Sequence, residues 1–271
     1  VIPFDQLFKK EFPEVTSHCY MENWYSEEII KYKDKKEIIK ITDAQNTFFE
    51  FFPFTFIKGS AKTALKDNTS IAISVETAQK LFGDEDPMGK IVTYSDKKLV
   101  VRGVYKIPGK SSMAPMAVTN LIEARMLPDI DNWGNFNWGL LLKLKNPADK
   151  DKVAARMEKL LHENRAMRWA KDEGLTPEEW MKKNGDHRTR IILGSLQDAR
   201  LHAIAEGFAE GKGNYQFLLI MLGLSILILI LSVVNYINLA TANAIKRAKE
   251  VGVRKILGAS KSNIIKQFLF E

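Results

Sequence analysis

The stretch from Asn214 to Ile245 contains no charged side chain, and its centre is almost entirely apolar. From Phe217 to Val234 only one glycine and two serines interrupt a run of large hydrophobic residues. At about 1.5 Å of rise per helical residue, roughly 20 such residues span the hydrocarbon core of a bilayer. A core helix of a soluble protein would place polar residues along one face, and this stretch has none to place there. We therefore expect a transmembrane helix over 214–245.

The residues after this helix are strongly basic. Residues 246–271 carry seven Lys or Arg and two Glu, whereas residues 1–245 hold 33 of the 40 basic and 31 of the 33 acidic residues. Positive charge beside a membrane helix marks the cytoplasmic side. The sequence therefore places residues 1–213 outside the cytoplasm and residues 246–271 inside it. Because the basic excess lies next to the helix and is not interleaved with aromatic residues, we do not expect nucleic-acid binding.

The chain begins at Val1 and has no leader that would carry 213 residues across a membrane. We therefore expect an earlier membrane helix before Val1. At the other end, a new apolar segment begins near Ile264. Both features predict that the sequence belongs to a multi-span membrane protein.

Short strands and helices alternate through residues 1–213, which are long enough for one large domain or two small ones. Runs of β-branched residues bounded by turn residues predict strands at 14–20, 37–42, 70–74, 90–94, 98–105 and 140–145. A hairpin at 96–98 is expected between the strands at 90–94 and 98–105. This irregular alternation with helices indicates an α+β extracytoplasmic domain.

Helices in this domain are indicated by their caps. Ser74 is a predicted N-cap for a helix over 75–82 that ends at Gly83. Thr176 opens a capping box, with proline at the first helical position, for a helix that ends near Asn184. An apolar stripe predicts a further helix over 150–164. The segment 207–213, rich in glycine and lysine, is the expected hinge before the membrane helix.

No pattern for catalysis, a cofactor or a metal is present in the sequence, so we expect neither an enzyme nor a cofactor. The segment 83–90 resembles a phosphate-binding loop, but its glycines are one residue too far apart and Ile91 replaces the required Ser or Thr. Gly194-Ser195 lacks the later glycine of a nucleophile elbow. The four histidines share no metal-ligand spacing: His18, His162, His187 and His202.

Three other features have bland interpretations. Cys19 is the single cysteine, so it cannot form an intrachain disulfide, and we expect it to be a small buried residue. The acidic run 84–86 is expected to be a solvated turn, although it could attract a cation. Six phenylalanines between Phe48 and Phe56 are expected to pack inside the domain, and a surface for a ligand or partner is the alternative.

Two parts of the chain carry specific motifs. The first is the tail, NYINLATANAIKRAKEVGVRKILGAS at 235–260 followed by QFLFE at 267–271. The second comprises the ectodomain motifs Phe48-Phe49, Gly59, IAIS at 71–74, Ala78, LFGDEDPMGK at 81–90 and VRGV at 101–104. Both resemble ABC-transporter permeases of the MacB/FtsX-like family. The tail is similar to that family's second membrane helix and the short cytoplasmic helix after it, and the ectodomain to its extracytoplasmic core domain. Residues 108–197 match only loosely, so a ligand site there stays open.

The resemblance implies a MacB-like periplasmic core domain over 1–213, a membrane helix over 214–245, and a cytoplasmic coupling helix with the start of the next membrane segment over 246–271. It implies a multi-pass inner-membrane permease that works with an ABC ATPase in a separate subunit or a fused domain. Its other expected partners are membrane lipid, a second copy or paired permease, and a periplasmic protein. Such a permease would couple ATP hydrolysis to movements of its periplasmic domain, for export or extraction of a substrate or for transmission of force.

The tail offers residues for this coupling. Glu250 and Arg254 form an i,i+4 pair in the favourable order, and Gly258 is placed to end the helix. Val251, Ile256 and Leu257 supply apolar contacts, while Arg254 and Lys255 can reach acidic groups on a partner. The candidate ATPase-coupling residues are therefore Glu250, Val251, Arg254, Lys255, Leu257 and Gly258.

Two alternatives remain open at this stage. The basic tail could serve only as an anchor at lipid headgroups. The chain could also be a membrane-anchored extracytoplasmic sensor of a signalling protein, with a kinase or linker helix after Glu271 where a permease would have a further membrane helix.

Overall fold

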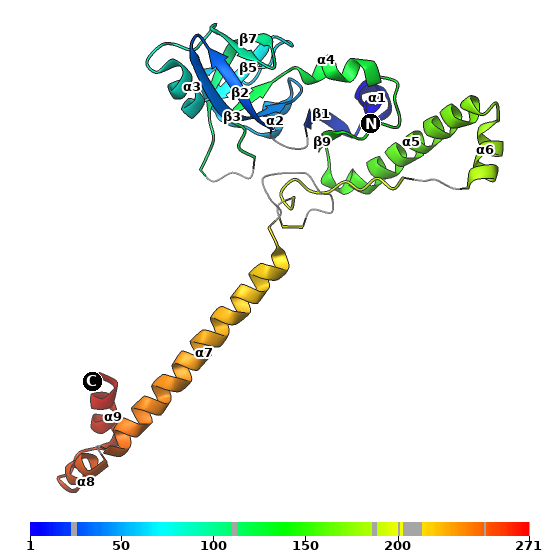
Figure 1. The fold of residues 1–271 in the computed structure, drawn as a ribbon. Helices are drawn as coiled ribbons and strands as arrows, with labels where there is room; N and C mark the ends of the chain where they lie inside the picture. The colour runs from blue at the N-terminus through cyan, green and yellow to red at the C-terminus, as the bar shows by residue number, and fades with distance from the viewer. Residues whose placement is uncertain are drawn as a thin grey trace. The chain divides into compact units, whose positions relative to one another are not determined.

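The computed structural model describes residues 1–22, 26–109, 113–185, 189–199, 201–202, 213–246 and 248–270. The chain forms two compact units, Val1–Gly213 and Asn214–Glu271, and each is described by itself (Figure 1). The hinge expected at 207–213 lies outside the described residues except for Gly213.

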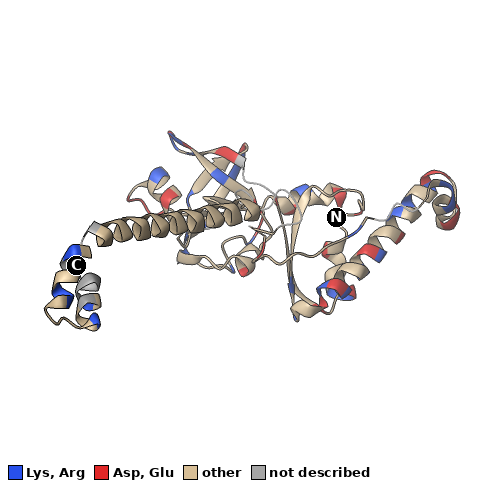
Figure 2. Cartoon of the chain, turned by 90° about the horizontal axis from the view of Figure 1, so that it is seen from below, with Lys and Arg blue, Asp and Glu red and all other residues tan. Residues whose placement is uncertain are grey.

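The second unit is built on α7 (Tyr215–Lys246), which forms from the apolar stretch of the sequence. The most apolar 18-residue window within residues 215–245 has a mean hydropathy of 3.1, and no part of that window is buried within the chain. Figure 2 shows this helix without charged residues until its end. The hydroxyls of Ser225 and Ser232 each donate to a carbonyl one turn back, at 2.8 Å. Their polar groups are thus satisfied within the helix, as a lipid environment requires. Two shorter helices follow, α8 (Ala248–Ile256) and α9 (Lys261–Phe270).

The first unit contains a seven-stranded sheet that closes on itself. The strand order is β4-β7-β5-β8-β3-β2-β6, and β6 also pairs with β7, so six strands form a barrel and β4 extends from it. The strands are β2 (Ser26–Tyr32), β3 (Lys35–Asp43), β4 (Thr55–Gly59), β5 (Ser70–Ser74), β6 (Ile91–Tyr94), β7 (Lys97–Lys106) and β8 (Ala117–Thr119).

The ten-residue strand β7 makes the closure possible. Its first residues, 97–100, pair with β6, and its last residues, 103–106, pair with β4. Its other edge pairs in parallel with β5. Because each edge of the long strand is used, the barrel leaves little unpaired backbone at this seam.

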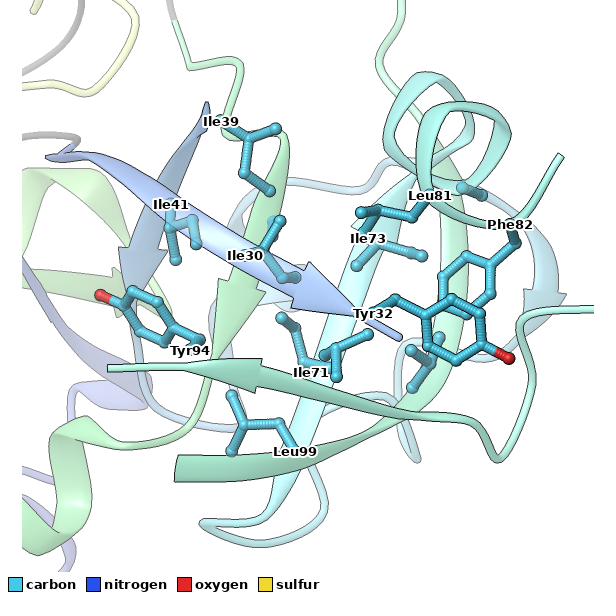
Figure 3. Close-up of a cluster of buried hydrophobic side chains, with 14 of the residues drawn as sticks. Ile30, Tyr32, Ile39, Ile41, Ile71, Ile73, Leu81, Phe82, Tyr94 and Leu99 are labelled. Carbon is cyan, nitrogen blue, oxygen red and sulfur yellow. The ribbon is translucent and has the colours of Figure 1, made fainter. Parts of the chain in front are cut away.

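Apolar side chains on alternate residues of the strands fill the barrel. Figure 3 shows isoleucines of β2, β3 and β5 directed into one cluster. Helix α3 (Val75–Phe82) covers this cluster with Leu81 and Phe82, and the Phe82 ring lies 4.3 Å from that of Tyr32. The bounds predicted for this helix are confirmed, because Ser74 accepts a hydrogen bond from the Thr77 amide at 3.1 Å.

The phenylalanine cluster packs in the interior, as expected. Helix α2 (Phe48–Phe51) begins it, and the most buried members are Phe48, Phe49, Phe52 and Phe54. They form one cluster with Ala72 of β5, Val118 of β8 and Tyr105 of β7. Strand β5 is therefore buried throughout, with the barrel core on one face and the aromatic cluster on the other.

A third hydrophobic cluster lies under a two-stranded sheet. In this sheet β1 (Val15–Glu22) pairs antiparallel with β9 (Trp138–Leu144), which confirms the strands predicted at 14–20 and 140–145. Around it lie α1 (Phe4–Glu11), α4 (Ile122–Met126) and α5 (Lys150–Asp172), each of which buries side chains in the cluster. Short 3-10 turns at Leu127–Asp129 and Pro147–Asp149 precede β9 and α5.

Helix α5 is longer than the predicted 150–164. Its second half packs on α6 (Pro177–Asn184), whose capping box at Thr176 is present as predicted. The rings of Trp169 and Trp180 lie 5.0 Å apart and join the two helices. The apolar stripe read from the sequence stopped at Leu161 because this later packing uses alanines and tryptophans.

Several elements were not predicted, namely α1, β2, β4, β8 and α4. The hairpin between β6 and β7 is present, but it turns at Ser95 and Asp96, which have φ values of 48° and 59°. The turn thus lies one residue earlier than the sequence indicated, with both central residues in the left-handed region that a two-residue hairpin needs.

Candidate functional site

Helix α8 ends in a defined stop. The Gly258 amide donates to the carbonyl of Lys255 at 3.2 Å, and the Ala259 amide donates to that of Arg254 at 3.1 Å. These two bonds form a Schellman motif, which satisfies carbonyls at the helix end. Gly258 has a φ of 91°, a value that glycine adopts without the strain a side chain would add. Gly258 therefore ends the helix, as its place in the sequence predicts.

The next helix begins at once. The Ser260 hydroxyl accepts a hydrogen bond from the Asn263 amide at 3.3 Å, so Ser260 is the N-cap of α9. Only four residues separate the last residue of α8 from the first of α9. The chain after α7 is consequently a pair of short helices with a fixed turn between them.

One face of α8 exposes large apolar side chains. Val253, Ile256 and Leu257 are 57%, 87% and 80% exposed. Their i, i+3, i+4 spacing places them on the same side of the helix. Val251 is partly buried and lies on another side. Val251, Ile256 and Leu257 were predicted as apolar contacts and Val253 was missed, because its three-residue spacing from Ile256 becomes a signal only once the helix register is known. We call Val253, Ile256 and Leu257 the apolar face of α8.

Of the two cations near the end of α8, Arg254 flanks the apolar face and Lys255 lies on the opposite side of the helix. Arg254 and Lys255 are exposed in the last turn of α8, where positive charge interacts favourably with the helix dipole. Figure 2 shows Lys and Arg gathered on the segment after α7. The side chain of Glu250 lies outside the described part of the chain, so its pair with Arg254 stays a prediction. The structure thus places four of the predicted coupling residues, Arg254, Lys255, Leu257 and Gly258, at the end of α8.

In the first unit, the acidic turn at 84–86 is engaged by lysines. Glu85 lies 3.0 Å from the Lys33 ammonium and accepts a hydrogen bond from the Tyr32 hydroxyl at 3.1 Å. The Lys33 and Tyr32 hydrogen bonds lower the pKa of Glu85. Asp86 lies 3.0 Å from Lys58, whose hydrogen bond likewise lowers the pKa of Asp86. Neighbouring lysines are therefore the observed counterions of this turn.

His18 and His162 contact side chains that are neither histidine nor cysteine. His18 lies 2.9 Å from Asp5, and His162 contacts the sulfur of Met181, whereas His187 is outside the described residues. Within the described ranges, no group of three or more His, Cys, Asp or Glu is arranged to hold a metal ion. Cys19 is buried, and burial raises the pKa of its thiol to about 12, so it remains a protonated, unreactive thiol at neutral pH.

Comparison with known protein families matches the two units separately. Residues 3–160 match the MacB-like periplasmic core domain, and residues 222–271 match the FtsX-like permease C-terminal region. The chain belongs to the MacB/FtsX-like family of ABC transporter permeases. The permease is thus a membrane protein with an α+β periplasmic domain, one long transmembrane helix and short C-terminal helices.

Individual relatives are distant. The macrolide export ATP-binding/permease protein MacB of Agrobacterium fabrum is 22% identical over 219 residues, which cover 78% of this chain and 28% of that protein. An uncharacterized ABC transporter permease of Methanocaldococcus jannaschii is 23% identical over 278 residues, covering 100% of this chain and 62% of the relative. A domain of a putative permease from Porphyromonas gingivalis has a TM-score of 0.47 at 25% identity, covering 57% of this chain and 74% of that one. The permease chain thus spans less than two thirds of the two curated relatives.

Proposed function

We propose that the permease couples ATP hydrolysis by a partner ABC ATPase to movements of its periplasmic domain, either to export or extract a substrate or to transmit force across the membrane. The observation that carries the proposal is the end of α8. A short helix with a fixed stop presents Val253, Ile256 and Leu257 together with two cations, and it follows directly on the transmembrane helix.

The apolar face of α8 is suited to docking. Exposed apolar side chains on one helix face are typical of a helix that binds in a groove of a partner. Arg254 beside the face provides the charge that an acidic rim of such a groove would pair with. A rigid turn at Gly258 would transmit the partner's movement into α9 and α7. The proposed coupling residues are therefore Val253, Arg254, Lys255, Ile256, Leu257 and Gly258, together with Glu250, whereas Val251 lies on another side of the helix.

Two further points support a permease over a sensor. The match of residues 222–271 to an FtsX-like permease region includes α8 and α9, a likeness that a sensor would not require. The name of the A. fabrum relative joins ATP-binding and permease functions in one protein, and the present chain covers only 28% of it. We place the ATPase of the present system in a separate subunit or domain, the permease in the inner membrane as a multi-pass protein, and a second permease copy beside it.

Co-purification of the ATPase with permease variants tests the docking. Val253→Asp combined with Leu257→Asp puts two charges into the contact, and a buried unpaired charge is strongly unfavourable. We expect this variant to lose the ATPase in detergent while α7 remains inserted. The matched control is Lys261→Gln with Lys266→Gln, which lowers the net charge by the same amount and leaves the apolar face intact.

The two variants separate docking from lipid anchoring. A tail that only binds lipid headgroups responds to total charge, so both variants would behave alike. Undiminished ATPase recovery with the double aspartate variant would overturn the proposal. Arg254→Glu is expected to weaken recovery and Arg254→Lys to retain most of it.

Orientation is tested by cysteine labelling in intact cells. A cysteine introduced at Lys212 should react with an impermeant reagent, and one at Lys249 should react only after lysis. Cys19 is buried and gives little background. The reverse pattern would overturn the orientation and the coupling role with it.

A further inference from the structure

A buried carboxyl group lies where strands β3 and β8 of the barrel end. Asp43, the last residue of β3, has no exposed side-chain surface. The Thr119 hydroxyl at the end of β8 donates a hydrogen bond to its Oδ1. Its Oδ2 lies 2.9 Å from the Nη1 of Arg125, but no hydrogen bond of proper geometry reaches Oδ2 from the described atoms. Asp43 therefore has one oxygen that is bonded and one that is held only by charge.

Arg125 is shared between two carboxylates. The same Nη1 donates to Oε1 of Glu22 at 2.5 Å, and the other oxygen of Glu22 accepts from the Asp43 amide at 3.4 Å. The side chains of Arg125 and Glu22 are 38% and 19% exposed, so the cluster reaches solvent on the Arg125 side. One guanidinium thus faces two carboxylates, and a proton on one of them would neutralise the cluster.

The cluster joins parts of the domain with separate hydrophobic cores. Asp43 and Thr119 belong to barrel strands, and Glu22 ends β1 of the two-stranded sheet. Arg125 lies on α4, which buries Ile122 and Met126 in the cluster beneath that sheet. Helix α4 follows β8 almost directly, and the ion pair of Arg125 with Asp43 holds this helix against the barrel.

Other charged groups near the cluster are few. The positive charge of Lys97, at the start of β7, favours the ionised form of Asp43, and the charge of Asp43 in turn raises the pKa of Tyr94 on β6. Glu28 of β2 acts on Tyr94 rather than on Asp43. Burial raises the pKa of Asp43 to about 7, Arg125 and Lys97 oppose this shift, and Glu22 adds to it.

We propose that Asp43 is a proton-binding site that controls the pairing of Arg125 and thereby the attachment of α4 to the barrel. When Asp43 is ionised, Arg125 holds α4 to both β3 and β1. When a proton binds at Oδ2, the attraction between Asp43 and Arg125 is lost and Arg125 pairs with Glu22 alone. A domain outside the cytoplasm meets the pH of its surroundings, so acid would loosen this junction.

The proton that loosens α4 is expected to have the opposite effect on the stability of the whole domain. The pKa of Asp43 is raised in the folded chain, to about 7 from 3.8, so its protonated form favours folding. Its contribution to stability is fully present below the usual pKa and is lost as pH rises through about 7. Protonation of Asp43 is therefore expected to stabilise the domain against unfolding while it loosens α4, a combination that a merely structural ion pair would not give.

The test compares the folding equilibrium and hydrogen exchange of the chain in detergent with those of its Asp43→Asn variant between pH 4.5 and 8. The asparagine keeps the shape of the side chain and cannot ionise. As the pH rises from 4.5 to about 7, the folding equilibrium constant of the native chain, divided by that of the variant, should fall about tenfold per pH unit. Above pH 7 the ratio should level off. Hydrogen exchange at residues 122–126, corrected for intrinsic rates, should be slower at pH 8 than at pH 5.5 in the native chain and equal at both in the variant. Exchange in α6 serves as the control.

Two further variants identify the group that titrates. Glu22→Gln removes a negative neighbour and should move the transition to lower pH, whereas Arg125→Gln removes the positive one and should move it to higher pH. These shifts remain measurable if Asp43→Asn fails to fold. A native-chain profile that is flat across the window, shifts of the same sign in the two variants, or unchanged pH dependence in Asp43→Asn would each overturn the proposal.

Discussion

The two units of the permease differ in the burial of their apolar side chains. In the barrel unit, isoleucines from three strands are buried in one cluster, and the phenylalanines of the α2 region are buried in another. In the second unit, α7 exposes its leucines and isoleucines along its whole length, and the apolar face of α8 is exposed as well. The first unit is therefore stabilised by contacts within the chain. The second has apolar surface that lipid around α7 and a partner at α8 would cover.

This difference predicts where substitutions act. In the barrel unit, a lost apolar contact should appear as a change in the free energy of unfolding. In the second unit, it should appear as a change in association. Matched pairs of residues test this distinction between effects on unfolding and effects on association.

Ile38 and Ile39 are neighbours on β3 and face opposite sides of the sheet. Ile39 is buried in the barrel, with 1% exposure, whereas Ile38 is 66% exposed. Ile39→Ala should lower the free energy of unfolding by about 2–5 kcal/mol, through lost burial and the cavity left behind. Ile38→Ala should change it by less than about 0.5 kcal/mol. Chemical denaturation of the periplasmic domain measures both, and equal effects would contradict the assignment of the barrel interior.

Gly59 and Gly89 both have positive φ values, 76° and 73°, but differ in their surroundings. A Cβ at Gly59 would lie 2.4 Å from the carbonyl oxygen of Arg102, and one at Gly89 would meet nothing within 4 Å. Both alanine variants should lose about 1–2 kcal/mol of stability, because a residue with a Cβ is strained in the left-handed region. Gly59→Ala should cost about 1–3 kcal/mol more, because backbone atoms must move apart. Similar costs at both sites would mean that the pairing of β4 with β7 is looser than described.

Local signals predicted the elements whose ends are capped. The helices at Val75–Phe82 and Pro177–Asn184 have the bounds read from Ser74, Gly83 and Thr176, because side chains adjacent in sequence form the caps. Strand β5 has the predicted bounds because its uniformly buried residues form a single β-branched run. Such elements depend on contacts between near neighbours in the chain.

Elements that depend on distant partners were missed. Strand β2 reads SEEIIKY, and its charges conceal that Ile30 and Tyr32 face the barrel core. The closure of the barrel depends on β7 pairing with three strands, which no local pattern shows. Likewise, the hydrogen bond between Asp43 and Thr119 joins residues 76 positions apart. At α8 the charges and the glycine stop were predictable, but the exposed face that includes Val253 needed the helix register.

Ser74 and Ser260 provide the same N-cap bond in different units. Each hydroxyl accepts from an amide three residues on, at 3.1 Å and 3.3 Å. Ser74→Ala should lower the stability of the periplasmic domain by about 1 kcal/mol, within a range of roughly 0.5–2. Ser260→Ala should leave that stability unchanged, since α9 belongs to the other unit. A shift in the domain's unfolding midpoint with Ser260→Ala would show that the two units are energetically coupled.

The smallest expected effect concerns Glu85, whose ion pair with Lys33 is exposed on both sides. Hydrogen bonds from Lys33 and Tyr32 lower the pKa of Glu85, so its contribution to stability is present above its usual pKa and lost as pH falls through the lowered one. Glu85→Gln should therefore cost a little at pH 7 in low salt, and nothing at pH 3 or in about 1 M salt, which screens exposed charges. Asp84→Asn in the same turn is the control. The pH dependence of Glu85 has the opposite sign to that of Asp43, since acid removes a favourable pair at the surface and relieves an unfavourable charge in the interior. Thermal unfolding of Glu85→Gln and Asp43→Asn across the same pH range measures both, and slopes of equal sign would contradict the division between exposed and buried carboxylates.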